Sequence, residues 1–230
     1  MNDKRVIVIS LGGSMIILSK GINLQFLKKF KSALRKHYHK NKFVIVTGGG
    51  SIARKYIQVL KAEGKSTEEQ SLAGIRATRM NALLLMQLFG KEVNDSLPLN
   101  MEEVKDNLHK NKVVICGALR YSSHSTSDAT SAKLASFLKA PFINITNVPG
   151  LYTKDPRKYK DAKFISRISW KEFEKMALKI KYHAGQHFIL DQQASTLIKK
   201  HKIKTYIIGS LLSLNNILNK KDFKGTLING

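Results

Sequence analysis

Residues 44–56 read VIVTGGGSIARKY, in which an apolar run leads into three glycines and then into a segment of helical character. The pattern predicts a strand, a glycine turn and the first turns of a helix. Backbone N–H groups at such a turn and helix start are well placed to bind a phosphate. The spacing matches neither the GxxxxGK[ST] loop nor the GxGxxG fingerprint. The stretch therefore predicts a phosphate site of another kind.

Strand-like and helix-like segments alternate on both sides of this stretch. Short apolar runs predict strands at residues 6–10, 43–46, 112–116, 141–145 and 204–208, with 226–228 as a possible edge strand. Helical spacing predicts helices at 24–34, 52–60, 72–89, 102–109, 128–138, 170–178 and 191–200. Residues 147–165 read as a loop that contains a hairpin. The alternation predicts an α/β fold with a mainly parallel sheet, and the absence of a linker predicts one domain over residues 1–230.

Composition narrows the class of protein. The chain has 40 Lys and Arg against 16 Asp and Glu, a net charge of +24, and 21 of the 40 basic residues precede Asp128. Because the basic residues are spread along the chain, we expect no basic tail, and charge alone does not separate a nucleic-acid partner from a basic surface. The single cysteine, Cys116, excludes an internal disulfide, and no run is long enough to span a membrane. We expect a cytoplasmic protein.

Polar or glycine-rich loops follow four of the expected strands, at residues 12–14, 48–51, 116–127 and 146–155. The carboxyl ends of parallel strands meet at one edge of a sheet, where ligands bind. Arg54 lies one helical turn after Gly50, so it either points back to a phosphate or is an ordinary exposed arginine. The third loop is rich in hydroxyls and ends at Asp128. Its last residues either cap a helix or bind a second anion.

Taken together, these motifs resemble those of the amino acid kinase family, and within it the archaeal-type uridylate (UMP) kinases. The resemblance runs nearly end to end and rests on ISLGGS (9–14), VTGGGSIARKYI (46–57), GIRATRMNA (74–82), STSDATSAKLASFL (125–138), ITNVPGLYTKDP (145–156) and AGQHFILDQQA (184–194). It implies a three-layer α/β/α fold and transfer of a phosphoryl group from ATP, with Mg²⁺, to UMP. It also implies a homo-oligomer, commonly a hexamer built from dimers. A membrane partner is not expected, and nucleic acid is an unlikely partner.

The resemblance also implies roles for particular residues. Asp128 and Arg54 would be the catalytic residues. The ATP-binding residues would be Gly13, Ser14, Gly50, Arg54, Thr146, Asn147, Tyr152 and Asp155. The UMP-binding residues would be Gly49, Ser71, Ser125, Thr126 and Ser127. No protein ligand for Mg²⁺ is implied, and the acceptor would bind the half formed by residues 1–140, with ATP on the half formed by 141–230.

Two departures from the family pattern lie on the acceptor side. Ser71 stands where archaeal-type kinases usually carry an aspartate that binds the ribose, and the loop before Asp128 is about two residues longer than usual. They leave open two alternatives: a kinase of the same fold for another small acceptor, or a nucleotide- or RNA-binding protein without turnover.

Overall fold

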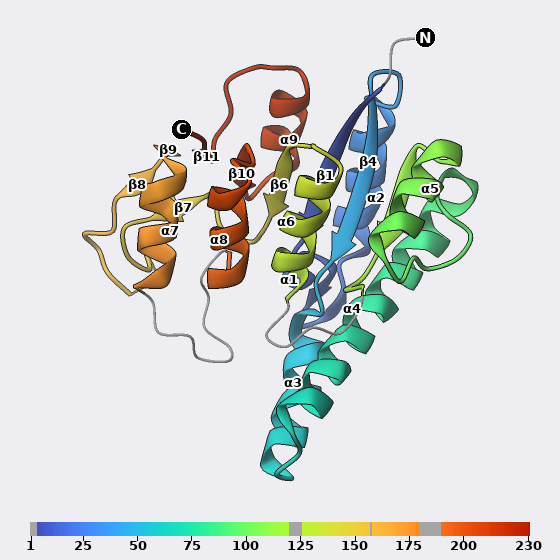
Figure 1. Ribbon diagram of the computed structural model, residues 1–230, viewed down its shortest axis with the longest axis horizontal. Coiled ribbons are helices and arrows are strands. Elements are labelled where there is room, and N and C mark those ends of the chain that lie inside the picture. The colour runs from blue at the N-terminus through green and yellow to red at the C-terminus, as the bar shows by residue number, and fades with distance from the viewer. Residues whose placement is uncertain (1–3, 120–125, 157, 180–189) are drawn as a thin grey trace.

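A seven-stranded sheet forms the centre of the computed structural model, which describes residues 4–119, 126–156, 158–179 and 190–230 (Figure 1). Its strands, in spatial order, are β5 (Val113–Cys116), β4 (Asn41–Thr47), β1 (Arg5–Leu11), β6 (Phe142–Ile145), β10 (Thr205–Ile208), β11 (Thr226–Ile228) and β9 (Arg167–Ile168). All neighbouring strands are parallel except β10 and β11. The mainly parallel sheet predicted from the sequence is confirmed, and it includes strands from both halves of the chain.

Short strands account for the differences from the expected pattern. β11 is not an edge strand, because the two-residue strand β9 pairs with its other side. Two small hairpins lie outside the main sheet: β2 (Ile17–Leu18) with β3 (Gly21–Ile22), and β7 (Leu151–Tyr152) with β8 (Phe164–Ile165). The second of these is the hairpin expected within residues 147–165. Strands of two residues carry no hydrophobic periodicity, so the sequence pattern could not locate them.

Helices cover both faces of the sheet. One face packs against α1 (Gly13–Ile16), α2 (Leu24–Arg35), α4 (Thr67–Phe89) and α9 (Leu211–Leu218), through a core that includes Ile9, Phe30 and Leu85. The other face packs against α5 (Met101–Lys110), α6 (Ser127–Phe137), α7 (Trp170–Leu178) and α8 (Gln192–Lys200), through a core that includes Val44 and Phe142. The fold is therefore the three-layer α/β/α sandwich. Helix α9 was not expected from the sequence, because its LLSLNNIL segment lacks a clear polar face.

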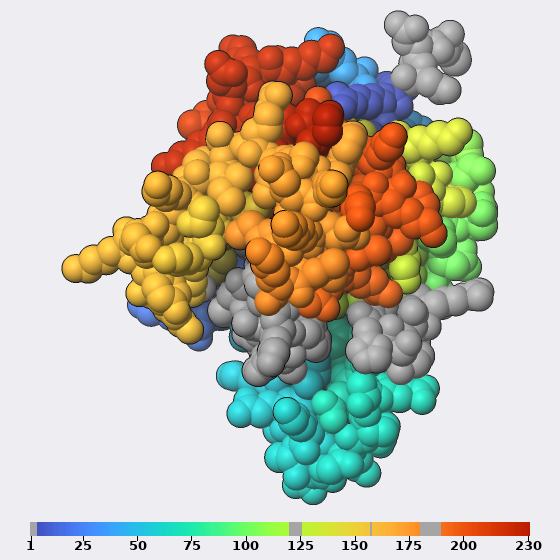
Figure 2. Space-filling model, turned by 60° about the vertical axis from the view of Figure 1, so that its left-hand side comes forward, coloured from blue at the N-terminus to red at the C-terminus, as the bar shows by residue number. Residues whose placement is uncertain are grey.

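Helix α4 and helix α3 (Gly50–Ala62) form an antiparallel pair that projects from the body of the protein (Figures 1 and 2). A capping box between Ser66 and Glu69 begins α4, so this helix starts five residues before the segment 72–89 predicted from the sequence. Small residues allow the close approach, since a Cβ on Gly74 would lie 3.3 Å from the Ile57 Cδ1. Among the described residues, no helix combines the length and the hydrophobicity that crossing a bilayer requires.

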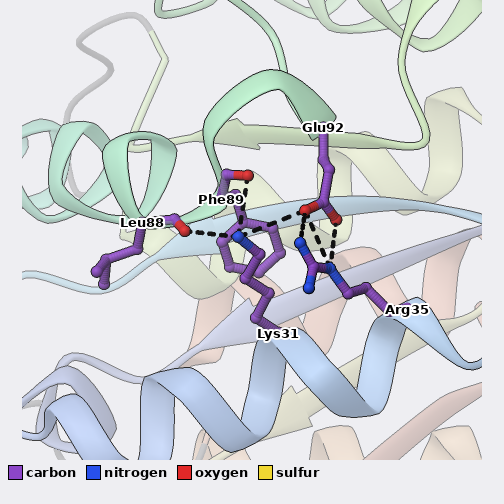
Figure 3. A network of polar contacts seen from close by, with 5 residues as sticks. All are labelled: Lys31, Arg35, Leu88, Phe89 and Glu92. Atoms are coloured by element: carbon purple, nitrogen blue, oxygen red, sulfur yellow. Dashed lines mark hydrogen bonds and ion pairs between the residues drawn. The ribbon is translucent and has the colours of Figure 1, made fainter.

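The C-terminal end of α4 is held by α2 through the polar contacts drawn in Figure 3. The Lys31 ammonium donates to the carbonyl oxygens of Leu88 and Phe89, at 2.7 and 3.1 Å, and lies 3.4 Å from the Glu92 carboxylate. Arg35 bonds both oxygens of the same carboxylate. Lys31 thus satisfies two of the carbonyl groups that every helix leaves free at its end. The hydrogen bond from Arg35, together with the charge of Lys31, lowers the pKa of Glu92, although partial burial opposes the shift.

We expect Lys31→Met to lower the free energy of unfolding by about 1–2 kcal/mol, because two charge-assisted bonds to the end of α4 are lost while the aliphatic stem remains. Chemical denaturation would measure the change. Lys28→Met is the matched control, since Lys28 is exposed on the same helix, and it should stay within about 0.5 kcal/mol of the wild type. Equal values for the two variants would show that Lys31 does not hold α4.

The only cysteine, Cys116, ends strand β5 and is fully buried. Burial raises the pKa of its thiol to about 12. At neutral pH the thiol is protonated and out of reach of solvent, so it has no part in a reaction at the surface.

Candidate active site

Three loops that follow strands are aligned by the sheet itself. The Gly12 N–H donates to Ile145, the Gly48 N–H to Leu11 and the Thr146 N–H to Ile208, each at 2.9 Å. Each bond runs from the residue after one strand to the last residues of its neighbour. The ends of β1, β4, β6 and β10 therefore form one continuous edge, as expected for the ligand-binding edge of a parallel sheet.

The two glycine turns at this edge pack backbone against backbone. A Cβ on Gly13 would lie 2.0 Å from the Gly50 nitrogen, and a Cβ on Gly48 would lie 2.6 Å from the Gly13 nitrogen. Gly50 has φ +64°, a conformation that favours glycine, and begins α3. Gly49 lies against Ala53, so no side chain fits there either. The amide groups at the starts of α1 and α3, including that of Ser14, thus lie together, an arrangement suited to phosphate oxygens.

Polar side chains of α4 hold the second glycine turn in place. Thr47 at the end of β4 donates to the Thr78 carbonyl at 2.8 Å, and the Asn81 amide donates to the Gly48 carbonyl at 2.7 Å. Thr78 in turn accepts from the Ala118 N–H at 2.9 Å. Arg79 donates to the carbonyl oxygens of Ala118 and Leu119. Thr78, Arg79 and Asn81 of the GIRATRMNA segment therefore support the site.

Asp128 lies where the loops meet and receives hydrogen bonds from two neighbouring strands. Ser10 of β1 and Asn144 of β6 are register partners, so their side chains stand side by side on the face covered by α6. The Ser10 hydroxyl donates to Asp128 Oδ1 at 2.9 Å, and the Asn144 amide donates to the same oxygen at 3.0 Å. Among the described residues, both side-chain hydrogen bonds to this carboxylate go to Oδ1.

The environment of Asp128 changes its acidity. Burial first, and then the negative charge of Asp191, raises the pKa of the Asp128 carboxyl from 3.8 to about 7, while the bonds from Ser10 and Asn144 act in the opposite direction. Asn144 Oδ1 is buried and has no hydrogen-bond partner among the described residues. A cation or a donor brought in by a ligand would satisfy this oxygen and favour the ionised form of Asp128.

Helices α6 and α8 begin side by side next to Asp128. Thr126, and not Ser127 or Asp128, is the N-cap of α6, because its hydroxyl accepts from the Ala129 N–H at 3.1 Å. The same hydroxyl donates to Asp191 Oδ2, and Asp191 Oδ1 caps α8 by accepting from the Ala194 N–H at 2.9 Å. Because capping is done by Thr126 and Asp191, the Asp128 carboxylate is free for another task.

The segment that follows β6 carries four of the residues expected to bind ATP: Thr146, Asn147, Tyr152 and Asp155. Thr146 and Asn147 lie directly after the strand, and their side chains are 3.5 Å apart. The Tyr152 ring meets the Phe164 ring edge-to-face at 5.2 Å across the β7–β8 hairpin. The Asp155 carbonyl accepts from the backbone of the next turn. The Leu151 N–H donates to the Thr226 hydroxyl at 2.7 Å, which ties this segment to β11.

Arg54 and Ser71 lie on the projecting pair. Arg54 is exposed and forms no ion pair with a described carboxylate. The Ser71 hydroxyl donates to the Thr67 carbonyl of its own helix at 2.8 Å and keeps its acceptor capacity. Ser71 lies one helical turn before Gly74 in α4. The Gly74 carbonyl oxygen would be 3.6 Å from a Cβ on Gly49. Ser125 lies outside the described residues.

Several contributors to this site were not among the residues expected to act: Ser10, Asn144 and Asp191, and the supporting residues Thr47, Thr78, Arg79 and Asn81. Ser10 and Asn144 stand inside apolar strands, and Asn81 inside an apolar helix. A polar residue within an otherwise apolar run was the signal that could have identified them, since a buried polar side chain needs a hydrogen-bond partner.

The fold and the paired glycine turns define a phosphate-binding α/β protein. Residues 5–209 match the description "Amino acid kinase family", and the chain belongs to that family. It is 35% identical over 226 residues to a protein named uridylate kinase from Methanococcus aeolicus, covering 97% of this chain and 99% of that one. It is 34% identical over 227 residues to a uridylate kinase from Methanocaldococcus jannaschii, again over 97% and 99% of the two chains.

Solved structures agree with this assignment of the fold. The structure of a uridylate kinase from Archaeoglobus fulgidus superposes with a TM-score of 0.82 at 31% identity, over 96% of this chain and 99% of that chain. The UMP kinase from Bacillus anthracis superposes with a TM-score of 0.81 at 21% identity, over 98% and 96% of the two chains, which supports the fold alone.

Proposed function

We propose that the protein is a uridylate kinase that transfers the γ-phosphoryl group of ATP to UMP in the cytoplasm and releases ADP and UDP. The observation that carries the proposal is the packing of the two glycine turns against each other beside Asp128. Two phosphate chains that meet head to head need backbone donors on both sides and no intervening side chains. The names of the full-length relatives support UMP as the acceptor.

In this proposal the residues divide between donor and acceptor. Gly13, Ser14, Gly50 and Arg54 bind the phosphates of ATP, and the 146–155 segment binds its adenosine part. Gly49 binds the phosphate of UMP, with Ser71 and the hydroxyls of Ser125, Thr126 and Ser127 around the nucleoside. Asp128 positions the cationic groups that neutralise the transferred phosphoryl, and it takes no part in covalent chemistry.

Mg²⁺ enters the proposal as a partner of ATP. The described residues contain no group of three or more His, Cys, Asp or Glu that could hold a metal ion. Mg²⁺ favours phosphate oxygens and water over closed protein cages, so an ion carried by ATP would need few protein ligands, and Asp128 is the carboxylate that would help to hold it. Bound there, the ion would neutralise charge on the phosphates. The side chains themselves orient the two nucleotides and keep their phosphates in line.

A coupled assay for ADP release tests the proposal. The acceptors compared are UMP, CMP, dUMP, isopentenyl phosphate and acetylglutamate, each with ATP and Mg²⁺. We expect turnover with UMP well above that with the others. Turnover with a non-nucleotide acceptor and none with UMP would favour another small-acceptor kinase of the same fold. Turnover with none of them, in a folded protein that still binds nucleotide, would favour the non-catalytic alternative.

We expect Arg54→Ala to lower kcat/KM by about 10–100-fold, because a charged contact to the transferred phosphoryl is lost. Steady-state kinetics with varied ATP would measure it. Lys55→Ala is the matched control, since Lys55 is equally exposed and adjacent but points about 100° away around the helix. Equal losses in the two variants would show that the effect comes from helix charge and not from a contact of Arg54.

The proposal also includes assembly of the protein with copies of itself through the α3–α4 pair. Ile52, Tyr56 and Val59 form an exposed stripe along α3, and Met80 and Leu83 are exposed on α4. The helical positions place both stripes on the same side of the antiparallel pair. Large apolar side chains exposed together on a projecting pair are typical of an interface.

We expect wild-type protein to be oligomeric by size-exclusion chromatography with light scattering, and Val59→Glu with Met80→Glu to shift it to a smaller species. Charged side chains placed in an apolar interface lose solvation without finding partners. Leu212→Glu is the control, because Leu212 is 72% exposed on α9, away from the pair. A wild-type monomer, or an unchanged oligomer in the double variant, would exclude this interface.

A further inference from the structure

We propose that the edge of the sheet opposite the candidate active site binds the phosphate backbone of single-stranded nucleic acid. A lysine directly precedes each of the parallel strands β5, β4, β1 and β10, and another lies three residues before β6. These five lysines, here called the basic edge, are Lys112, Lys40, Lys4, Lys139 and Lys204. The edge is uppermost in Figure 1, where the α3–α4 pair points the other way.

The topology explains why these lysines gather in space although they are far apart in the sequence. Each parallel crossover returns the chain to the same edge, so the residues that lead into every one of these strands arrive there. Backbone bonds fix their alignment: the Arg5 N–H donates to the Lys40 carbonyl at 3.2 Å, and the Phe43 N–H to the Lys112 carbonyl at 2.9 Å. The Phe142 N–H donates to the Lys204 carbonyl at 3.0 Å. With strands about 4.8 Å apart, five strands give a row about 19 Å long.

The charges of the basic edge have no carboxylate partners among the described residues. Lys40, Lys112, Lys139 and Lys204 are exposed, Lys4 is half-buried, and none is part of an ion pair there. The contact with the Lys112 amine, and then partial burial and the charges of Lys112 and Lys42, lower the pKa of Lys4. Neighbouring ammonium groups without an acid between them gain when an anion binds.

Backbone conformation gives a second, independent observation. Three non-glycine residues in the described part of the chain have positive φ, and all three are lysines: Lys139, Lys202 and Lys220, at +49°, +49° and +57°. They follow the ends of α6, α8 and α9, where glycine or asparagine is the usual residue. Helix α6 leads into β6 and α8 into β10, and α9 runs back from the end of β10 toward the same edge. Lysine at these three positions adds positive charge to that edge. The backbone conformation does not favour lysine, so it does not explain why lysine stands there.

The surface chemistry favours nucleic acid over other anionic partners. The exposed large hydrophobic residues, among them Tyr56, Val59 and Leu212, are not at the starts of these five strands. Peripheral membrane binding uses apolar side chains for insertion, and protein interfaces have an apolar centre. A phosphate backbone needs neither, and lysines alone supply a sequence-independent affinity that depends on salt. The row is long enough for several nucleotides.

Fluorescence anisotropy with a labelled 30-nucleotide single-stranded RNA of mixed sequence, between about 50 and 300 mM KCl, tests the proposal. The edge variant carries Lys40→Gln, Lys112→Gln, Lys139→Gln and Lys204→Gln. The control variant carries Lys28→Gln, Lys29→Gln, Lys171→Gln and Lys175→Gln. These four control lysines are exposed on α2 and α7, so both variants lose the same charge. Thermal melting verifies that each is folded, and saturating ATP and UMP keep the candidate active site filled.

We expect the folded edge variant to bind RNA at least about 10-fold more weakly than the wild type near 100 mM KCl. Its salt slope should fall by about 3, since each single-strand phosphate contact contributes about 0.7. The control variant should stay within about threefold of the wild type. Equal losses in both variants would overturn the proposal in favour of diffuse surface charge. Wild-type binding to phosphatidylserine vesicles with the same dependence on the edge lysines, and no RNA binding, would assign the edge to membranes instead.

Discussion

The Asp128→Asn variant should lose at least about 100-fold in kcat while remaining folded, because asparagine cannot supply the negative charge that positions cationic groups at the transferred phosphoryl. Asparagine Oδ1 can still accept from Ser10 and Asn144, the two donors that now bond Asp128 Oδ1. The local geometry is therefore retained, and the loss reports on charge. Steady-state turnover with UMP and ATP would measure the effect.

Asp128→Asn should lower turnover but raise the free energy of unfolding at alkaline pH. The folded-state pKa of Asp128 is raised from 3.8 to about 7. The folded protein therefore binds more protons than the unfolded chain between these values, and stability falls as pH rises through this window. At pH 8 the buried, ionised carboxylate destabilises the folded state, and asparagine carries no charge. We therefore expect Asp128→Asn to raise the free energy of unfolding by on the order of 1–2 kcal/mol.

The two measurements on this variant distinguish mechanism from misfolding. A variant that is less stable at pH 8 and inactive would show only that the site is damaged. A stable variant with wild-type turnover would remove Asp128 from the mechanism. The stability gain should also disappear at about pH 3 and below, where the wild-type carboxyl is largely protonated in both the folded and the unfolded state.

The second large effect is expected from Gly13→Ala. The added Cβ would lie 2.0 Å from the Gly50 nitrogen and 2.4 Å from its Cα, both backbone atoms with no side-chain freedom to move. The two glycine turns must separate, which should lower the free energy of unfolding by about 2–4 kcal/mol. Separation also moves the amide groups apart, so the KM for ATP should rise by more than about tenfold. Calorimetry and steady-state kinetics would measure the two effects.

Gly74→Ala is the control for this substitution. Gly74 is inside α4, and its added Cβ would meet only the flexible Ile57 Cδ1, at 3.3 Å. We expect a change of no more than about 1 kcal/mol, with stabilisation favoured, because alanine has the higher helix propensity. If Gly13→Ala were as mild as Gly74→Ala, the close packing of the turns would not be needed for stability.

The sequence predicted the fold well where an apolar run or an apolar periodicity is clear. The run before Gly48 forms the expected strand, and the stretch 72–89 lies in the expected helix. The two-residue strands were missed because they are too short to show a periodicity, and α9 was missed because its LLSLNNIL segment lacks a clear polar face. β11 was expected at an edge because no sequence pattern predicts β9, the two-residue strand that pairs with it.

The candidate site was predictable where glycine marks it and unpredictable where side chains meet across the sheet. The glycines of both turns stand next to each other, as loop positions at the ends of parallel strands require. The pairing of Ser10 with Asn144 depends on which strands are neighbours and in what register, which no local pattern specifies. The bond between Thr126 and Asp191 joins residues 65 positions apart and depends on the packing of α6 against α8.

Cys116 has a practical consequence for studies of motion in this protein. Since the only natural thiol is buried and its pKa is raised to about 12, thiol-reactive probes at neutral pH have no competing target in the folded chain. A single cysteine introduced at the exposed Lys65, in the turn between α3 and α4, would therefore carry a fluorophore or spin label alone. The natural chain already provides the background in which the position of the projecting pair can be followed spectroscopically as nucleotides bind.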